Sequence, residues 1–333
     1  MAARHVFLLV AALTAGCGGS DTPTSPSNPS GGGGDVVPAP TISCPSNVSA
    51  VTTTTTSQVA YPAPTVSGGR TPVTVACTPA SGATFPLGST SVSCTATDAL
   101  SRSATCSFSV NVARVPTLQR TSFLAFGDSV TAGEVTVPTS GGTELLGTPN
   151  FKLVVMPAAA YPVQLQLMLR NRYVTQANVI SVVNSGVSGE YAVDSVKRFS
   201  QVMTNVRPEV VLLLDGYNDL NNFGSSAISS AAAAVEAMAK DARSRGARVY
   251  IASLTPPRAG GRNAIPASTI ATYNDRMRAI AAGENAVFVD LYQALVSNVT
   301  TFVGVDGLHL TEVGYQKVAE TFFASIQATL QNP

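Results

Sequence analysis

Residues 122–133 read SFLAFGDSVTAG, in which an uninterrupted apolar run ends in a glycine turn. The run Ser122–Phe126 lacks the alternation of a half-exposed strand, so it is typical of a parallel strand that helices cover on both faces. Four later runs have the same character: Val179–Val183, Val210–Leu214, Val249–Ser253 and Ala286–Val289. We therefore expect five buried strands in an α/β domain that spans residues 120–333.

Helical segments separate these runs. Ser230–Arg245 is rich in alanine, places Glu236 four residues before Lys240, and ends at Gly246. A last helix, from about Thr311, has one apolar stripe formed by Val318, Phe322, Ile326 and Leu330. Strands that alternate with helices predict a doubly wound parallel sheet, whose chemistry gathers at the carboxyl ends of its strands.

Polar groups follow the first three of these strands. Asp128 and Ser129 come after the first, where a serine on a tight turn can act as a nucleophile and where the pair can equally cap the next helix. Gly189 lies in the loop after the second strand, where a glycine lets a backbone N–H face a substrate. Asn218 follows the third strand, and its side-chain amide can donate to a developing oxyanion.

A histidine near the C-terminus completes this set. Asp306 precedes His309 by three residues in a turn ahead of the last helix. At that spacing the carboxylate can bind one ring nitrogen and fix the tautomer, which leaves the other nitrogen for a serine. The chain has only one other histidine, His5, and it lies in the N-terminal export segment described below. His309 is therefore the expected base.

Together, these blocks resemble the SGNH (GDSL) hydrolase family, whose motif blocks all occur in order: Gly127-Asp128-Ser129, Asn184–Gly189, Asp215–Asp219 and Asp306–His309. The resemblance implies a three-layer α/β/α sandwich with a flavodoxin-like, five-stranded parallel sheet. It implies that Ser129 is the nucleophile, that His309 is general base and then acid, and that Asp306 orients His309. The implied oxyanion hole consists of the N–H groups of Ser129 and Gly189 and the side chain of Asn218.

The same resemblance implies hydrolysis of carboxylic esters of lipids or carbohydrates through a serine ester, with no cofactor and no metal. Two residues depart from the family pattern: Asp215 stands where many members have glycine, and Leu310 follows His309 where proline is common. We expect the Asp215 carboxyl to face away from the oxyanion hole. We expect a long loop from Glu134 to about Met156 that borders the acyl pocket.

Residues 41–113 form a different kind of region, with short alternating stretches, frequent turns and no helical periodicity. This pattern predicts a small all-β sandwich. Its cysteines are Cys44, Cys77, Cys94 and Cys106, and an even count in an exported small domain implies two disulfides. Of three possible pairings we favour Cys77 with Cys94, on neighbouring strands, and Cys44 with Cys106, on the outer ones.

This region resembles the HYR (hyalin repeat) family, an immunoglobulin-like module, in the stretches Ile42–Pro45, Cys77–Gly82, Phe85–Gly88, Val92–Asp98 and Cys106–Val110. The resemblance implies an adhesion or spacer role without chemistry of its own. The passive spacer is favoured over carbohydrate or protein binding, because the ionisable acids and bases of the region are only Arg70, Asp98 and Arg102.

The N-terminus has the features of an export signal. Arg4 and His5 precede the apolar run Val6–Ala12, and Leu13-Thr14-Ala15-Gly16-Cys17 resembles a bacterial lipoprotein cleavage site. We expect residues 1–16 to be removed, Cys17 to carry a lipid anchor, and residues 17–40 to be a flexible Gly/Ser/Pro linker. An ordinary secretory signal is the alternative. The expected location is therefore the cell envelope, at the outer membrane or cell surface, or the medium.

Composition limits the partners. The chain of 333 residues has 20 Lys+Arg against 19 Asp+Glu, which argues against binding nucleic acid because no basic excess is available to neutralise phosphates. We expect a monomer whose partners are an ester substrate and a membrane. The alternative function is a catalytically idle, surface-tethered adhesion or carbohydrate-binding lipoprotein, against which the complete set of site residues argues.

Overall fold

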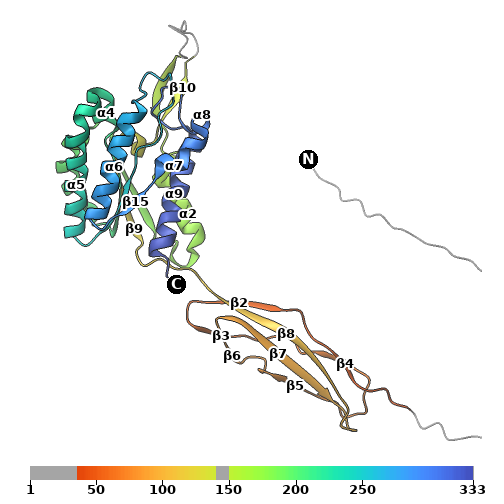
Figure 1. The fold of residues 1–333 in the computed structure, drawn as a ribbon. Coiled ribbons are helices and arrows are strands. Elements are labelled where there is room, and N and C mark those ends of the chain that lie inside the picture. Colours follow the sequence, from red (N-terminus) through yellow and green to blue (C-terminus); the bar gives the residue numbers. More distant parts are fainter. Residues whose placement is uncertain (1–35, 140–149, 333) are drawn as a thin grey trace, which may run out of the picture. The chain divides into compact units, whose positions relative to one another are not determined.

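The computed structural model describes residues 36–139 and 150–332 (Figure 1). The predicted signal segment, Cys17 and most of the predicted linker lie outside these residues. The chain divides into two compact units, of which the larger comprises Val48–Val59, Thr84–Thr90 and Val110 onward. The remaining described residues form the smaller unit. Within residues 36–139 and 150–332, no helix combines the length and apolarity needed to cross a membrane.

A five-stranded, all-parallel sheet forms the centre of the larger unit. Its strands are β9 (Ser122–Gly127), β12 (Ser181–Gly186), β13 (Val210–Leu214), β14 (Arg248–Ala252) and β15 (Val287–Val289). They lie in the order β12-β9-β13-β14-β15. This is the flavodoxin-like order, with the second strand of the domain at the edge beside the first. The predicted parallel sheet is therefore confirmed.

The second strand is displaced from its predicted position at residues 179–183. Val179 and Ile180 both donate their backbone N–H to the carbonyl of Gln176, which closes a turn. The ladder begins only at Ser181, whose N–H donates to the carbonyl of Thr121, and it continues through the polar residues up to Gly186. Apolar composition therefore misplaced the strand, because backbone pairing with β9 decided its ends.

The register of the sheet brings three loops together. Gly127 at the end of β9 lies opposite Gly186 of β12 on one side and opposite Leu214 of β13 on the other. The segments that follow these three strands therefore begin side by side at one edge of the sheet. They carry Ser129, Gly189 and Asn218, respectively.

Helices cover both faces of the sheet (Figure 1). On one face, α5 (Ile228–Ser244) packs between α3 (Ala192–Val206) and α6 (Ala267–Gly283), and on the other α2 (Tyr161–Arg172) packs against α9 (Glu312–Leu330). The shorter helices are α1 (Ser129–Ala132), α4 (Tyr217–Phe223), α7 (Leu291–Leu295) and α8 (Val299–Phe302). The two helices predicted from sequence correspond to α5 and α9 with ends shifted by one or two residues.

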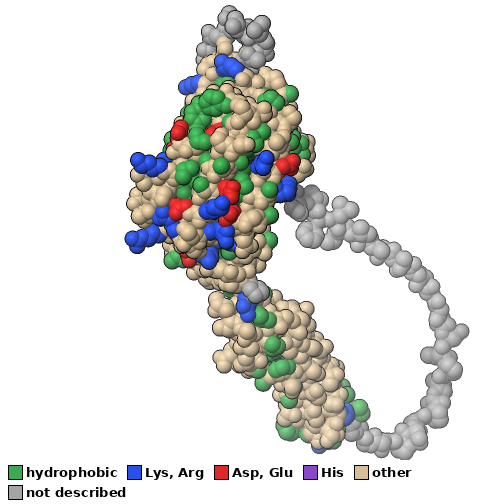
Figure 2. All heavy atoms as spheres, turned by 60° about the vertical axis from the view of Figure 1, so that its left-hand side comes forward, with side chains coloured by type: hydrophobic (Ala, Val, Ile, Leu, Met, Phe, Trp, Pro, Cys, Tyr) green, Lys and Arg blue, Asp and Glu red, His purple; other side chains and the backbone are tan. Residues whose placement is uncertain are grey.

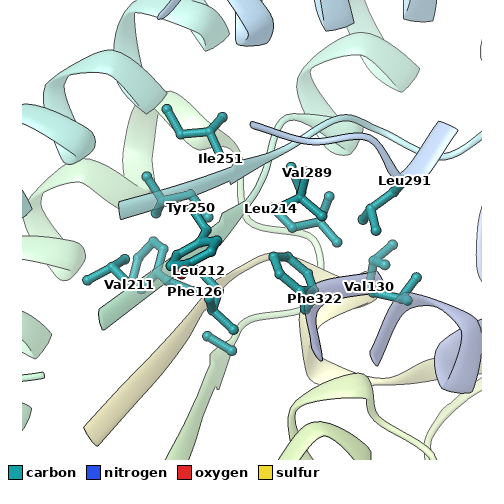
Figure 3. Packing of buried hydrophobic residues seen from close by; sticks show 14 of the residues in the cluster. Phe126, Val130, Val211, Leu212, Leu214, Tyr250, Ile251, Val289, Leu291 and Phe322 are labelled. Atoms are coloured by element: carbon teal, nitrogen blue, oxygen red, sulfur yellow. The ribbon is translucent and has the colours of Figure 1, made fainter. Parts of the chain in front are cut away.

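The core between the sheet and its helices consists of apolar side chains that solvent does not reach. Figure 3 shows Phe126 and Leu212 of the sheet and Phe322 of α9 among the core side chains, and all three are fully buried. The predicted stripe of α9 is buried along its whole length, since Val318, Ile326 and Leu330 are also inaccessible. The apolar periodicity of the last helix therefore identified its core face correctly.

The segment expected to be a loop from Glu134 to Met156 is instead a two-stranded antiparallel ribbon. It consists of β10 (Glu134–Pro138) and β11 (Phe151–Val155), and the residues 140–149 between them are not described. Val135 is buried in the core of the larger unit, while Thr136 beside it is half-buried. The backbone pairing from Glu134 with Val155 to Pro138 with Phe151 shows that the expectation of a loop was wrong for these two stretches.

The N-terminal region is built from strands and turns without a helix among the residues described between 36 and 120. Its strands are β1 (Thr41–Ser43), β2 (Val48–Thr52), β3 (Thr56–Gln58), β4 (Thr65–Ser67), β5 (Thr74–Thr78), β6 (Thr84–Pro86), β7 (Gly88–Thr97) and β8 (Ser103–Arg114). Disulfides join Cys44 to Cys106 and Cys77 to Cys94, which is the favoured pairing. Cys77 and Cys94 lie opposite each other in the β5–β7 ladder.

The few charges of this β-rich region are organised around one buried carboxylate. Asp98 accepts backbone N–H bonds from Arg70, Leu100 and Arg102, and it binds the Arg102 guanidinium at 2.7 Å. These hydrogen bonds outweigh the desolvation of the group and hold the pKa of Asp98 well below its usual value. The guanidinium also donates to the carbonyls of Val37 and Pro38. Figure 2 shows few charged side chains on the visible face of this region.

Candidate active site

The turn after β9 places Ser129 at the start of α1. Gly127 is required there, because a Cβ at this position would lie 1.9 Å from the carbonyl oxygen of Leu214. The Asp128 carboxylate caps α1 by accepting from the N–H of Val130 at 3.0 Å, and it also accepts from the N–H of Tyr217. The capping role considered for Asp128 therefore exists. It fixes the turn that presents the Ser129 hydroxyl.

Ser129, His309 and Asp306 form one continuous hydrogen-bonded chain. The Ser129 Oγ lies 2.9 Å from His309 Nε2, and His309 Nδ1 lies 2.6 Å from Asp306 Oδ2. All three residues are at most 5% exposed. The fold thus joins residues that are 180 positions apart in the sequence.

The Asp306 carboxylate is itself held in place. It accepts from the side-chain amide of Asn263 at 3.1 Å and from the backbone N–H groups of Leu308 and His309. The carboxylate therefore cannot rotate away from the ring nitrogen without losing several bonds. Asn263 was not identified from the sequence, because it belongs to the segment after β14 and reaches Asp306 only in the folded chain.

A second carboxylate, which sequence reasoning did not assign to the site, contacts the same histidine. Glu134 Oε2 lies 3.2 Å from His309 Nε2, the nitrogen that also faces Ser129. The Glu134 carboxylate also accepts a hydrogen bond from the Ser188 hydroxyl. In the sequence, Glu134 is only the residue after Gly133, and that glycine ends α1 in the left-handed conformation with φ +91°.

The two further donors expected from sequence lie on neighbouring loops. The Asn218 side-chain amide donates one hydrogen bond to the carbonyl of Glu190 at 2.9 Å, and it has a second N–H to offer. Gly189 directly precedes Glu190 and has φ +77°, a conformation that favours glycine, and a Cβ there would meet no atom within 4 Å. The bond from Asn218 to Glu190 therefore joins α4 to the loop that carries the Gly189 N–H.

Asp215, the unusual residue before Asn218, is directed into the helical layer. It is 4% exposed, and its carboxyl binds the Ser195 hydroxyl of α3 at 3.1 Å and the N–H of Gly216. The Ser195 hydroxyl in turn lies 3.6 Å from the sulfur of Met238 in α5. These partners agree with the expectation that the Asp215 carboxyl faces away from the oxyanion hole.

The site places the His309 ring between the carboxyl groups of Asp306 and Glu134. Burial lowers the pKa of His309, but the hydrogen bonds to Asp306 and Glu134 outweigh it and raise that pKa to about 9. The hydrogen bond from His309 in turn lowers the pKa of Glu134. Two buried carboxyls nearby behave in the opposite way: desolvation raises the pKa of Asp128 to about 7 and that of Asp215 well above its usual value.

Comparisons with known proteins bear on this chemistry. Residues 125–317 match the model of the GDSL-like lipase/acylhydrolase family, and residues 35–112 match that of the HYR domain. No curated protein matches the chain. Among solved structures it is similar to a lipase/acylhydrolase from Enterococcus faecalis, with 23% identity, a TM-score of 0.48, and coverage of 63% of this chain and 97% of that one. It is also similar to the acetylxylan esterase Axe2 from Geobacillus stearothermophilus, with 20% identity, a TM-score of 0.47, and coverage of 63% and 94%.

Proposed function

Because this chain belongs to the GDSL-like lipase/acylhydrolase family, we propose that it is a serine esterase that uses Ser129, His309 and Asp306. The observation that supports this assignment is the buried hydrogen-bonded chain from the Ser129 hydroxyl through both ring nitrogens of His309 to Asp306. In such a chain the imidazole can take the serine proton while the carboxylate stabilises the ring that has become cationic.

In the first half of the reaction, Ser129 Oγ attacks the carbonyl carbon of the ester and passes its proton to His309 Nε2. The carbonyl oxygen becomes an oxyanion, which accepts from the N–H groups of Ser129 and Gly189 and from the amide of Asn218. The C–O bond to the alcohol then breaks. His309 delivers its proton to the leaving oxygen, and the acyl group remains on Ser129.

Water completes the cycle. It attacks the acyl carbon while His309 Nε2 takes one of its protons, and the second tetrahedral intermediate then expels Ser129 Oγ. His309 returns the proton to that oxygen, and the carboxylic acid leaves. Throughout, Asp306 holds Nδ1–H and so keeps the Nε2 lone pair directed at Ser129. We propose acyl esters of lipids or acetyl esters of carbohydrates as the substrate class.

The test is hydrolysis of 4-nitrophenyl esters from acetate to palmitate by the full chain and by Ser129→Ala. We expect turnover by the wild type, loss of at least 10³-fold in the variant, and covalent labelling of the wild type alone by a fluorophosphonate. Ser268→Ala, which changes an exposed serine on α6, is the matched control and should behave as wild type. Absence of both turnover and labelling in the wild type would overturn the proposal and favour the idle, ligand-binding alternative.

We also propose that the chain is an exported lipoprotein anchored through Cys17, on the support of the sequence Leu13–Cys17. Cells that express the chain and are fed radiolabelled palmitate should incorporate label into it. The Cys17→Ala variant should remain unlabelled. Incorporation that is equal in both would contradict the anchor at this residue.

A further inference from the structure

Both ring nitrogens of His309 face a carboxylate. Asp306 Oδ2 lies 2.6 Å from Nδ1, and Glu134 Oε2 lies 3.2 Å from Nε2, where the Ser129 hydroxyl is also within hydrogen-bond distance. The Glu134 side chain is only 14% exposed, so water screens this contact weakly. The Glu134 carboxylate therefore contacts the proposed catalytic base, although the proposed catalytic cycle does not use it.

The protonation state of the ring decides whether this contact is attractive. A neutral imidazole with its proton on Nδ1 presents a lone pair at Nε2, and a carboxylate oxygen next to that lone pair is repelled. An imidazolium donates from both nitrogens and can bind both carboxylates at once. The position of Glu134 is therefore complementary to the cationic ring and opposes the neutral ring that must accept the proton of Ser129.

We propose that Glu134 is a positioning residue that holds His309 as an imidazolium in the resting enzyme and thereby sets the pH above which Ser129 can be activated. This inference rests on the proposed function for its kinetic consequence, but not for the ion pair itself. Glu134 does not contact the ester in this mechanism. It acts through the base.

The fold fixes Glu134 firmly in this role. Its backbone pairs with Val155 in the β10–β11 ribbon, and its carbonyl accepts from the Tyr315 hydroxyl of α9 at 2.6 Å. Its carboxylate also accepts from the hydroxyl of Ser188, the residue before Gly189. Glu134 thus connects the histidine to the loop that carries a proposed oxyanion donor, and its carboxylate cannot leave the ring without also losing the bond to Ser188.

The other titratable and charged groups around His309 do not compete with Asp306 and Glu134 for the ring. On the β9 side, Asp128 is buried, and attraction to His309 partly offsets the desolvation that raises its pKa. On the α9 side, burial keeps the Tyr315 phenol neutral by raising its pKa. Two arginines lie on adjacent segments: Arg258 donates to the carbonyls of Thr300 and Val303, and Arg198 is paired with Glu190. Only Asp306 and Glu134 form ion pairs with the ring among the described residues.

A pKa of about 9 for His309 agrees with this geometry. At pH 7 only about one ring in a hundred would then be neutral, since each pH unit below the pKa lowers that fraction tenfold. We expect kcat/KM to rise with pH to about 9 in the wild type. The side chain that most sets this limit, after Asp306, is Glu134.

The experiment combines two readouts on the full chain. The first is the pH profile of kcat/KM on a 4-nitrophenyl ester, compared between wild type and Glu134→Gln. The second is the NMR titration of the His309 ring in a His5→Gln background, which leaves His309 as the only histidine. Removing an opposite charge at hydrogen-bond distance should lower the pKa of His309 by about one unit or more. The acid limb of the profile should move by the same amount, which makes the variant about tenfold or more faster than wild type near pH 7.

Two further variants make the result specific. Glu134→Asp keeps the charge and should keep the acid limb closer to the wild type than Glu134→Gln does. Glu312→Gln is the matched control, because Glu312 is an exposed acid three residues from His309 that makes no ion pair with it in the described structure. It should change neither readout.

The outcomes are distinguishable. An unchanged His309 titration in Glu134→Gln, with the variant folded by circular dichroism, would overturn the inference whatever the activity. If Glu134→Gln does not fold, the same titration on Glu134→Asp decides, since the shorter side chain withdraws the carboxylate from the ring and should lower the pKa of His309. A wild type that hydrolyses no ester, but whose His309 pKa falls in Glu134→Gln, would contradict the proposed function and leave the ion pair in place.

Discussion

At the scale of single residues, the four carboxyl groups near Ser129 form two pairs whose pKa values are shifted in opposite directions. Asp306 and Glu134 are hydrogen-bonded to the His309 ring, and these bonds lower their pKa values in spite of burial. Asp128 and Asp215 are buried and accept directly only from neutral donors, so desolvation dominates and raises their pKa values. For each carboxyl, the direction of the pKa shift follows from the balance between desolvation and its direct hydrogen-bond partners.

Asp306→Asn tests the role of the carboxylate on Nδ1. The amide has the same shape but no charge, and its NH2 group can hold the ring in the wrong tautomer, so we expect kcat/KM to fall about 10³–10⁴-fold. The measurement is ester hydrolysis across pH 6–10. Asp275→Asn, on the exposed face of α6, should retain full activity. A loss below tenfold would show that Asp306 does not orient the base.

Asp215→Asn tests the buried neutral acid. Burial raises the pKa of Asp215 in the folded protein, while the unfolded chain releases this proton near pH ~4. Between those two values folding takes up a proton, so the contribution of Asp215 to stability is present at low pH and is lost as the pH rises. The variant should therefore be more stable than wild type at pH 8, with a smaller gain at pH 4, when both are unfolded in urea.

Activity provides the second readout for this variant. Because the Asp215 carboxyl binds Ser195 and Gly216, we expect esterase rates within a few fold of wild type. A collapsed rate would show that the carboxyl acts on the site. The control for stability is Asp275→Asn, which removes an exposed carboxyl on α6.

At the scale of elements, the junction of α1 and β10 determines where Glu134 lies. Gly133 ends α1 with φ +91°, and the chain then enters β10 directly. The β10–β11 ribbon also contacts the loop that carries the histidine, since a Cβ at Gly304 would lie 2.5 Å from Thr136 Oγ1. One short turn thus connects Ser129 to the carboxylate that faces His309.

Gly133→Ala tests this junction. The new Cβ would adopt an unfavourable backbone conformation and lie 2.6 Å from the Cβ of Ala160. We expect the free energy of unfolding to fall by about 1–3 kcal/mol, measured by urea denaturation. Gly283→Ala in α6 is the matched control, because a Cβ there meets no atom within 4 Å. It should be neutral or stabilising, and equal losses in both variants would contradict the argument.

At the scale of the whole molecule, the chemistry and the disulfides occupy different parts of the sequence. The proposed catalytic residues lie between Ser129 and His309, and both disulfides lie between Cys44 and Cys106. Charges follow the same division, since the chain has 20 Lys+Arg and 19 Asp+Glu, while residues 41–113 contain only three residues of these four types, Arg70, Asp98 and Arg102. The residues that match the HYR domain, 35–112, include both disulfides.

Removing the disulfides one at a time tests this division. The bonds close 62 and 17 residues of chain, so the chain-entropy model predicts losses of about 4 kcal/mol for Cys44→Ala/Cys106→Ala and about 3 kcal/mol for Cys77→Ala/Cys94→Ala. Differential scanning calorimetry of the full chain should show a transition lowered by each pair. Esterase activity at 25 °C should remain, and its loss in either variant would show that the β-rich region supports the catalytic residues.

The sequence by itself determined the fold class and the members of the Ser129–His309 chain. Local signals carried this information: near-continuous apolar runs gave the strands, the four-residue stripe gave the buried face of α9, and Asp306 lies within one turn of His309. The resemblance to a known family supplied the role of Ser129. The chosen cysteine pairing also followed from neighbouring strands.

Only the tertiary structure decided the ends of β12, the strands of the β10–β11 ribbon, the Asn263 contact and the second carboxylate on the histidine. Each depends on groups far apart in the sequence, such as Ser181 with Thr121 and Glu134 with His309. Local composition does not predict such contacts, because it reflects only the conformational preferences of residues that are neighbours along the chain. Its charge state and partners are set by whatever the packed layers bring against it.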